Sequence, residues 1–231
     1  MLFALGVAKP LANSSPIGPL LLTGVTIATL CIPLWRADRC GLSYASLGLH
    51  LRNLREDLAG LAWLALLLFP TAALVFHLMV SHGASWLQAA GWESLAALLP
   101  RGRLTLPAWP GDWAASAALL LSGLGYTATV LLVAALPEEL FFRGYLQGQL
   151  ERWAPPHARI FGVLFGRAAC LAALLFALGH FLGEWNAYRL ATFFPGLLFA
   201  WLYTRSGSIV GALLLHTLCN LFAELLFRLH F

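Results

Sequence analysis

The sequence predicts an all-α membrane protein, a polytopic helical bundle of about six to eight transmembrane helices. Of its 231 residues, 60% are hydrophobic and only 10% are charged, and the mean hydropathy is +0.79. An ordinary soluble domain carries about 25% charged residues. Long apolar runs recur along the chain, and a backbone in hydrocarbon finds no water to bond. Each run is therefore expected to be a helix.

The apolar runs are the predicted spans. They cover about residues 17–35, 58–80, 113–136, 168–183, 191–204 and 208–227. None of them alternates apolar and polar residues as barrel strands do. Because the runs and their connections take up the chain, we expect one transmembrane domain over residues 1–231. The first 22 residues lack the pattern of a secretory signal, so the N-terminus is expected to be retained.

The third run is too long for a simple span. If helix continued from Trp113 to Trp153, it would measure on the order of 60 Å at 1.5 Å per residue, about twice the hydrocarbon thickness. We expect it to break or to protrude, with the Gly123–Gly125 segment and Pro137 as candidate break points. A further span or a re-entrant segment is then possible.

Charged residues and tryptophans predict the topology. Arginines gather between the first two runs and after the third, so both loops are expected in the cytosol, while the segment 81–112 is rich in interfacial residues and is expected outside. Its expected anchors are Trp86, Trp92, Trp109 and Trp113. The single Lys and the many Arg and Ala residues favour a GC-rich bacterial genome. We therefore expect a multi-pass protein of the bacterial inner membrane.

The charge distribution argues against a nucleic-acid partner, and the cysteine spacing argues against disulfide or metal roles. The net charge of +4 is spread over span ends, so nucleic acid is not expected as a partner. The cysteines are far apart and show no paired-ligand spacing, which predicts small core residues without disulfide or metal roles. They are Cys31, Cys40, Cys170 and Cys219.

Two adjacent acids and a base follow the third apolar run directly. On a helix, Glu139 and Arg143 are four residues apart and face each other, whereas Glu138 points about 100° away and has no local cation. Ionisable residues at membrane depth mark function by default. Glu138 is therefore a candidate general base, and the alternative is a charge cluster at a helix end.

Two histidines lie in later runs. His180 follows Phe176 by four residues, and His216 precedes Asn220 by four, which places an imidazole and an amide on one helix face. Taken singly, His180 fits a hydrogen-bonded packing residue, and the second pair fits a polar contact between helices. Together with Glu138, they match the needs of water activation, because a carboxylate and an imidazole can take a proton while an imidazole and an amide can donate to an oxyanion.

These residues resemble the motifs of the CAAX protease and bacteriocin-processing enzyme family, often called CPBP or Abi. The family's EExxxR motif is similar to Glu138, Glu139 and Arg143, and its FxxxH motif to Phe176 and His180. Its HxxxN motif is similar to His216 and Asn220. The motif-bearing core covers about residues 113–227, and the first hundred residues are similar only loosely.

The resemblance implies an intramembrane endopeptidase with a catalytic cavity in the bilayer. In that reading Glu138 and His180 activate water, His216 and Asn220 stabilise the oxyanion, and Glu139 with Arg143 orients the site. Phe176 supports His180 as part of its motif. The implied substrate is a membrane-associated or lipidated protein or peptide, cut near a terminus. The oligomeric state is not predicted.

A metal is the main alternative within this reading. The family is classed both as metalloproteases and as glutamic proteases, and Glu138, His180 and His216 are the residues that would ligate zinc. No HExxH motif is present and Asn is a poor zinc ligand, so we favour a site without metal.

Two functions of other classes stay open. A non-catalytic immunity or interaction protein could be built on the same scaffold. A proton-coupled transporter also uses buried Glu and His, but it is expected to show repeated halves, which this sequence lacks.

Overall fold

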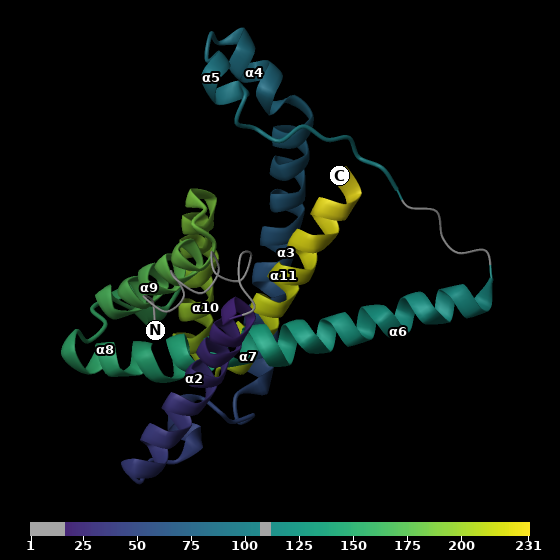
Figure 1. The fold of residues 1–231 in the computed structure, drawn as a ribbon. Helices are drawn as coiled ribbons and strands as arrows, with labels where there is room; N and C mark the ends of the chain where they lie inside the picture. The colour runs from purple at the N-terminus through teal and green to yellow at the C-terminus, as the bar shows by residue number, and fades with distance from the viewer. Residues whose placement is uncertain (1–16, 107–111) are drawn as a thin grey trace. The chain divides into compact units, whose positions relative to one another are not determined.

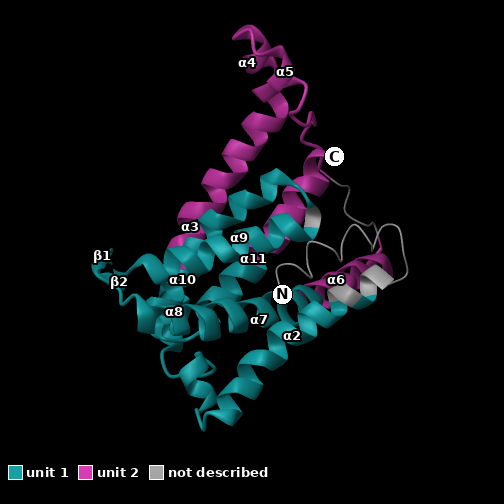
Figure 2. Cartoon of the chain, turned by 60° about the vertical axis from the view of Figure 1, so that its left-hand side comes forward, with its two compact units in different colours: residues 1–61, 128–217 teal, residues 62–127, 218–231 magenta. Residues whose placement is uncertain are grey.

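The computed structural model describes residues 17–106 and 112–231 (Figure 1). The predicted retention of the N-terminus and the anchor role of Trp109 lie outside these residues. The chain divides into two compact units, residues 1–61 with 128–217 and residues 62–127 with 218–231 (Figure 2). The single transmembrane domain over the whole chain stays a prediction.

The first unit carries most of the helices. They include α2 (Ile17–Arg39), η1 (Tyr44–Leu47), the start of α3 (Leu54–Leu78), η3 (Val130–Ala135), α7 (Leu136–Glu139), η4 (Leu140–Gln147), α8 (Gly148–Trp153), α9 (Arg167–Glu184), η5 (Ala187–Thr192), α10 (Phe193–Ser206) and the start of α11 (Val210–His230). Strands β1 (Ala158–Ile160) and β2 (Val163–Phe165) form an antiparallel hairpin in a segment predicted as loop.

The second unit contains the rest of α3 and the end of α11. It also holds η2 (Met79–Gly83), α4 (Ala84–Ala89), α5 (Glu93–Ala96) and most of α6 (Trp113–Thr129). The Phe69 and Phe222 rings lie 4.8 Å apart, and His77 Nδ1 lies 3.1 Å from His230 Nε2. These contacts join α3 to the end of α11.

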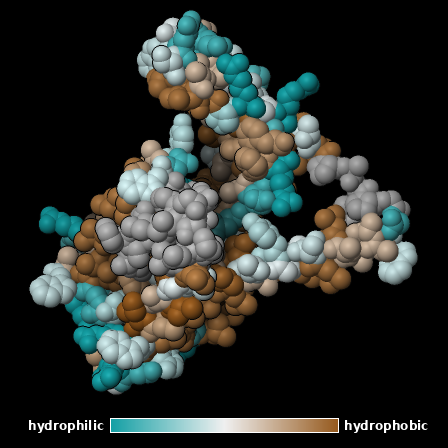
Figure 3. All heavy atoms as spheres, in the orientation of Figure 1, coloured by the Kyte–Doolittle hydropathy of each residue, from teal (hydrophilic) through white to brown (hydrophobic). Residues whose placement is uncertain are grey.

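All six apolar runs form helices, which confirms the all-α membrane fold. Three described helices are long and apolar enough to cross a membrane, namely Leu54–Ala89, Trp113–Trp153 and Val210–His230, and Arg167–Gly183 is a shorter apolar helix. Large apolar side chains such as Leu66 and Leu121 are exposed, and hydrophobic residues cover much of the surface seen in Figure 3. Such a surface suits lipid. The number of spans and their sidedness stay predictions.

The helix from Trp113 to Trp153 continues without a break. The expected break at Gly123–Gly125 is absent, because that segment lies inside α6. Pro137 lies in the short α7 between two π-helical segments, η3 and η4. The wider π turns bond each N–H one residue further back, as Leu136 N–H does to Leu131 O, and this accommodates a residue that lacks a donor.

Three of the four cysteines are exposed, and Cys219 is half-buried. The prediction that they are small core residues is therefore wrong. Lipid is as apolar as a protein core, so hydropathy does not distinguish the two sides of a membrane helix. Among the described residues, no disulfide is formed.

Small residues bring α9 and α10 close together. Ala169, Ala173 and Ala177 of α9 are buried, as are Gly196 and Ala200 of α10. Small side chains let membrane helices approach closely. Both helices also contact η4, the segment that follows the two acids. A polar face of η4 is thereby enclosed by helices rather than exposed.

The turn between α10 and α11 is held by the loop before α3 and by the first turn of α3. Ser206 Oγ donates to the buried Asp57 carboxylate at 2.6 Å, Asn53 donates to Ser206 O, and Ile209 N–H donates to Gly48 O at 3.0 Å. Gly48 has φ +76°, and a Cβ there would lie about 3 Å from Ile209. The start of α11, and with it the register of His216, is fixed by this contact.

Candidate active site

A buried ion pair lies at the base of the site. Arg143 Nη1 donates to Glu139 Oε1 at 3.1 Å, and both side chains are fully buried. Arg143 Nη2 donates to the carbonyl of Gly196 in α10 at 3.1 Å. The guanidinium also lies over the Phe176 and Phe199 rings, at 4.5 and 5.1 Å from the centroids. A buried charge of this kind needs all its partners, so the pair holds the helices in one arrangement.

His216 is bound to the same carboxylate. Its Nδ1 lies 2.7 Å from Glu139 Oε1, across 77 residues of sequence, and only 5% of its side chain is exposed. Its ring stacks on Phe199 with centroids 4.9 Å apart and planes 14° apart. The carboxylate and the phenyl ring together fix the position of the imidazole and leave Nε2 facing away from Glu139.

His180 is oriented by its own helix. Its Nδ1 lies 3.1 Å from the backbone oxygen of Phe176, one turn earlier in α9. The Phe176 ring lies 4.5 Å from the His180 ring and 5.6 Å from the His216 ring. Phe176 therefore contacts both imidazoles.

Both imidazoles point one nitrogen at Glu138. Glu138 Oε2 lies 3.9 Å from His180 Nε2 and 3.8 Å from His216 Nε2, and 31% of the Glu138 side chain is exposed. These distances exceed a direct hydrogen bond and suit a bridging water. The Oε2 atom itself is buried and has no hydrogen-bond partner among the described residues.

The hydrogen bonds assign the tautomers. The Nδ1 of each ring faces an oxygen acceptor, the Phe176 carbonyl or the Glu139 carboxylate, so each Nδ1 carries a hydrogen. In the neutral rings both Nε2 atoms then present lone pairs toward the Glu138 carboxylate. Three acceptors meet with no protein donor between them, and a water molecule or an added proton satisfies them.

Asn220 lies one turn beyond His216 in α11 and belongs to the second unit. The four-residue spacing from His216 corresponds to about one helical turn. The role of Asn220 at the site stays a prediction. The other six predicted residues, Glu138, Glu139, Arg143, Phe176, His180 and His216, all lie in the first unit and contact one another as described.

Whether a metal takes part stays a prediction. In the described part of the chain, no group of three or more His, Cys, Asp and Glu side chains is placed to hold a metal ion. Glu138, His180 and His216 are the residues that would ligate zinc, and Glu138 Oε2 lies 3.9 and 3.8 Å from the two imidazole Nε2 atoms.

Sequence reasoning missed the contribution of α10. Gly196 accepts from Arg143, and Phe199 lies between Arg143 and His216. A Cβ at Gly196 would lie 3.3–3.4 Å from Phe176, Ala173 and Arg143, so the glycine permits the close packing. In the sequence, both residues sit in an apolar run where glycine and phenylalanine are common, and nothing there distinguishes them.

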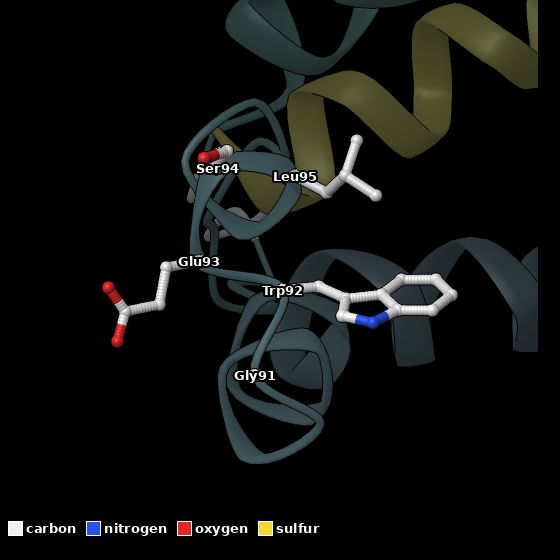
Figure 4. Close-up of a pocket in the computed structure, with 5 residues that line it drawn as sticks. All are labelled: Gly91, Trp92, Glu93, Ser94 and Leu95. Carbon is white, nitrogen blue, oxygen red and sulfur yellow. The ribbon is translucent and has the colours of Figure 1, made fainter.

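A surface hollow in the second unit has no comparable chemistry. It is lined by Gly91–Leu95, and the Trp92 and Glu93 side chains point in opposite directions (Figure 4). A lone exposed carboxylate without an imidazole or a cation beside it cannot activate water.

Comparison with known families agrees with the site. Residues 120–222 match the family model described as Type II CAAX prenyl endopeptidase Rce1-like. No curated protein and no solved structure matches the chain. The matched segment contains every residue of the three motifs, from Glu138 to Asn220. This match agrees with the resemblance to the CAAX protease and bacteriocin-processing enzyme family, and residues 120–222 are similar to the Rce1-like type.

Proposed function

We propose that this protein is an intramembrane endopeptidase that hydrolyses a peptide bond with a water activated by Glu138 and His180. One observation carries the proposal: the Nε2 atoms of His180 and His216 both lie within 3.9 Å of Glu138 Oε2, in a largely buried site. A general base must reach its proton directly or through one water. The geometry meets that condition.

Hydrolysis then proceeds through a tetrahedral intermediate. A water between Glu138 and His180 attacks the scissile carbonyl carbon, a C–O bond forms, and the water proton passes to Glu138 or His180. The same group then gives the proton to the leaving amine as the C–N bond breaks. The products are a carboxylate and an amine, and no electron acceptor is needed.

The oxyanion is assigned to His216, and Asn220 is the second donor that the resemblance to the HxxxN motif implies. To donate, His216 Nε2 must carry a proton, and the Glu139 carboxylate at Nδ1 orients the ring for this. Arg143 holds Glu139 in place. Two donors aimed at a developing negative charge accelerate acyl transfer strongly. Glu139 and Arg143 thus act on the reaction through His216.

The substrate follows from the setting of the site. Ionisable residues within apolar helices reach peptide bonds held at the bilayer, which favours a membrane-associated or lipidated protein or peptide cut near a terminus. We place the enzyme as a multi-pass protein of the bacterial inner membrane, without a nucleic-acid partner and without a cofactor. A non-catalytic immunity or interaction role and proton-coupled transport are the competing functions.

Comparison of membrane proteomes tests the function and identifies the substrate. Protein termini would be mapped by mass spectrometry in the native host with and without the gene, and with Glu138→Gln restored in its place. We expect at least one membrane-associated protein to keep its uncut end in both the deletion and the Glu138→Gln strain. Peptides spanning that end would then be cleaved by the purified protein in liposomes. Termini that are identical in all strains, with no cleavage in liposomes, contradict the proposal.

A further inference from the structure

A β-hairpin projects between α8 and α9 and is fastened to α10. β1 and β2 pair with Ile160 opposite Val163, so Phe161 and Gly162 form the two-residue turn, with φ of +49° and +80°. Positive φ at both positions is typical of a type I′ hairpin turn. The Trp201 indole donates to the Ile160 carbonyl at 3.0 Å. The hairpin tip therefore has a fixed place beside the C-terminal end of α10.

A hollow of about 610 Å³ lies between the hairpin and the end of α10. It is lined by both strands and the turn, and on the other side by Thr204 and Arg205. Its two charged residues are Arg159 and Arg205, and no acidic side chain lines it. The hollow therefore presents a positive surface.

Each arginine is held by one contact and has further N–H donors that a ligand could use. Arg159 Nη1 donates to the Gly162 carbonyl at 3.1 Å, and the Arg205 guanidinium lies 5.4 Å from the Trp201 ring centroid. A guanidinium has five N–H donors in a planar fork that matches phosphate oxygens. Among the described residues, no carboxylate forms an ion pair with either arginine. A bound anion would accept hydrogen bonds from both guanidinium groups.

Apolar side chains lie in and beside the same hollow. Phe161 and Leu164 line it and are 79% and 43% exposed, and the neighbouring Ile160 is 43% exposed. In water this surface is unfavourable, because exposed apolar area gains free energy on burial. A ligand that offers both an anionic group and hydrocarbon satisfies the arginines and the tip together.

We propose that this hollow binds the phosphate headgroup of an anionic phospholipid, with Phe161 and Ile160 set into the adjoining acyl region. Clusters of basic residues next to an apolar anchor recognise anionic lipids in this way. Arg167, beside the hairpin at the start of α9, is 13 residues from His180, or about 20 Å along the helix. The lipid site is thus separate from the reacting groups, and it holds this end of α9 and α10 at the interface.

Native mass spectrometry of the full chain in detergent tests the site. The protein would be titrated with phosphatidylglycerol and, in parallel, with phosphatidylcholine of the same acyl chains. We expect Arg159→Gln/Arg205→Gln to weaken phosphatidylglycerol binding by about tenfold or more, since each arginine near an anionic surface contributes about 1 kcal/mol. Phosphatidylcholine binding should not change. Arg101→Gln/Arg103→Gln removes the same charge from the second unit and should bind phosphatidylglycerol as the unchanged chain does.

Two further arms keep the result decisive. Arg159→Lys/Arg205→Lys preserves the charge and should keep most of the affinity, while Phe161→Ser keeps both arginines and should weaken binding severalfold by removing the apolar contact. Equal phosphatidylglycerol binding in the Gln variant and the unchanged chain would overturn the proposal. An equal loss of phosphatidylglycerol binding in the Arg101→Gln/Arg103→Gln variant would also overturn it. Displacement of the lipid by millimolar inorganic phosphate or by an acidic peptide would show a site for free anions or for protein instead, and would also overturn it.

Discussion

Glu138 and Glu139 are adjacent in sequence and have different surroundings. Glu139 is fully buried and contacts Arg143 and His216, whereas Glu138 is partly exposed and faces the imidazole Nε2 atoms. The Glu139 carboxylate is thus held by protein partners, whereas Glu138 Oε2 has no hydrogen-bond partner among the described residues. The difference arises because neighbouring residues on a helix point about 100° apart.

Replacing Glu138 by Gln removes the acceptor for the water proton and keeps the size of the side chain. We expect kcat for a membrane-anchored peptide to fall by about 10²–10⁴-fold, the usual contribution of a general base. Thermal stability in detergent should change little, because no described hydrogen bond to Oε2 is lost. Glu93→Gln, at an exposed carboxylate, is the matched control and should retain full activity. Full activity in Glu138→Gln would contradict the proposed chemistry.

Phe199 is a positioning residue by its geometry. Phe199→Leu removes the ring that stacks on His216, and such aromatic contacts contribute about 0.5–1.5 kcal/mol. We expect kcat to fall about threefold to tenfold with KM nearly unchanged, measured well below the unfolding temperature. Phe194→Leu lies in the same helix at an exposed position and should leave kcat unchanged. A Phe199→Leu protein with reduced stability but normal kcat would limit Phe199 to packing.

At the scale of elements, η4 packs against η1 on one side and against the helices of the site on the other. It contacts α2, η1, α9 and α10 within the first unit. Its buried face carries Arg143, Gly144 and Gln147, and Gln147 donates to Thr204 Oγ1 at 2.9 Å. Leu140, at the start of η4, packs with Ala37 and Ile209 in an apolar core. The polar groups of the site are thus held by a segment that is packed on several sides.

Gly144 is the place where η1 comes closest to η4. A Cβ at this position would overlap the Leu47 carbonyl oxygen, which is backbone and cannot rotate away. We expect Gly144→Ala to destabilise the protein by about 1–3 kcal/mol, the usual cost of overpacking. Thermal unfolding in detergent measures the loss. Gly148→Ala, one turn later, meets nothing within 4 Å and should be neutral or slightly stabilising. Equal stability of the two variants would show that η1 shifts freely.

At the scale of the whole molecule, the chain is a helical membrane protein in which only 10% of the residues are charged. Among the described residues, buried ionisable side chains include Glu139, Arg143 and His216. A buried charge in a membrane helix is costly unless it is paired. The bonds of the Glu139 carboxylate to Arg143 and His216 in the first unit reduce that cost.

We propose that the site works without a metal. We expect purified enzyme to contain substoichiometric zinc by inductively coupled plasma mass spectrometry, and to keep its activity in 1,10-phenanthroline. A thermolysin-type zinc peptidase assayed in parallel should lose its activity in the same chelator. Stoichiometric zinc together with inhibition by the chelator, reversed on adding zinc back, would contradict this prediction.

The sequence by itself determined what depends on composition and local period. Low charge and long apolar runs led to the all-α membrane fold, and the four-residue spacing of Glu139 and Arg143 led to their contact, because helix geometry alone sets both. Only the tertiary structure decided which groups from separate helices meet. The bond from His216 to Glu139, the ring of Phe199 and the hairpin beside Arg205 depend on how each helix is rotated about its axis. Hydropathy does not encode that rotation, because lipid and protein interior are equally apolar and the packing of small side chains settles it.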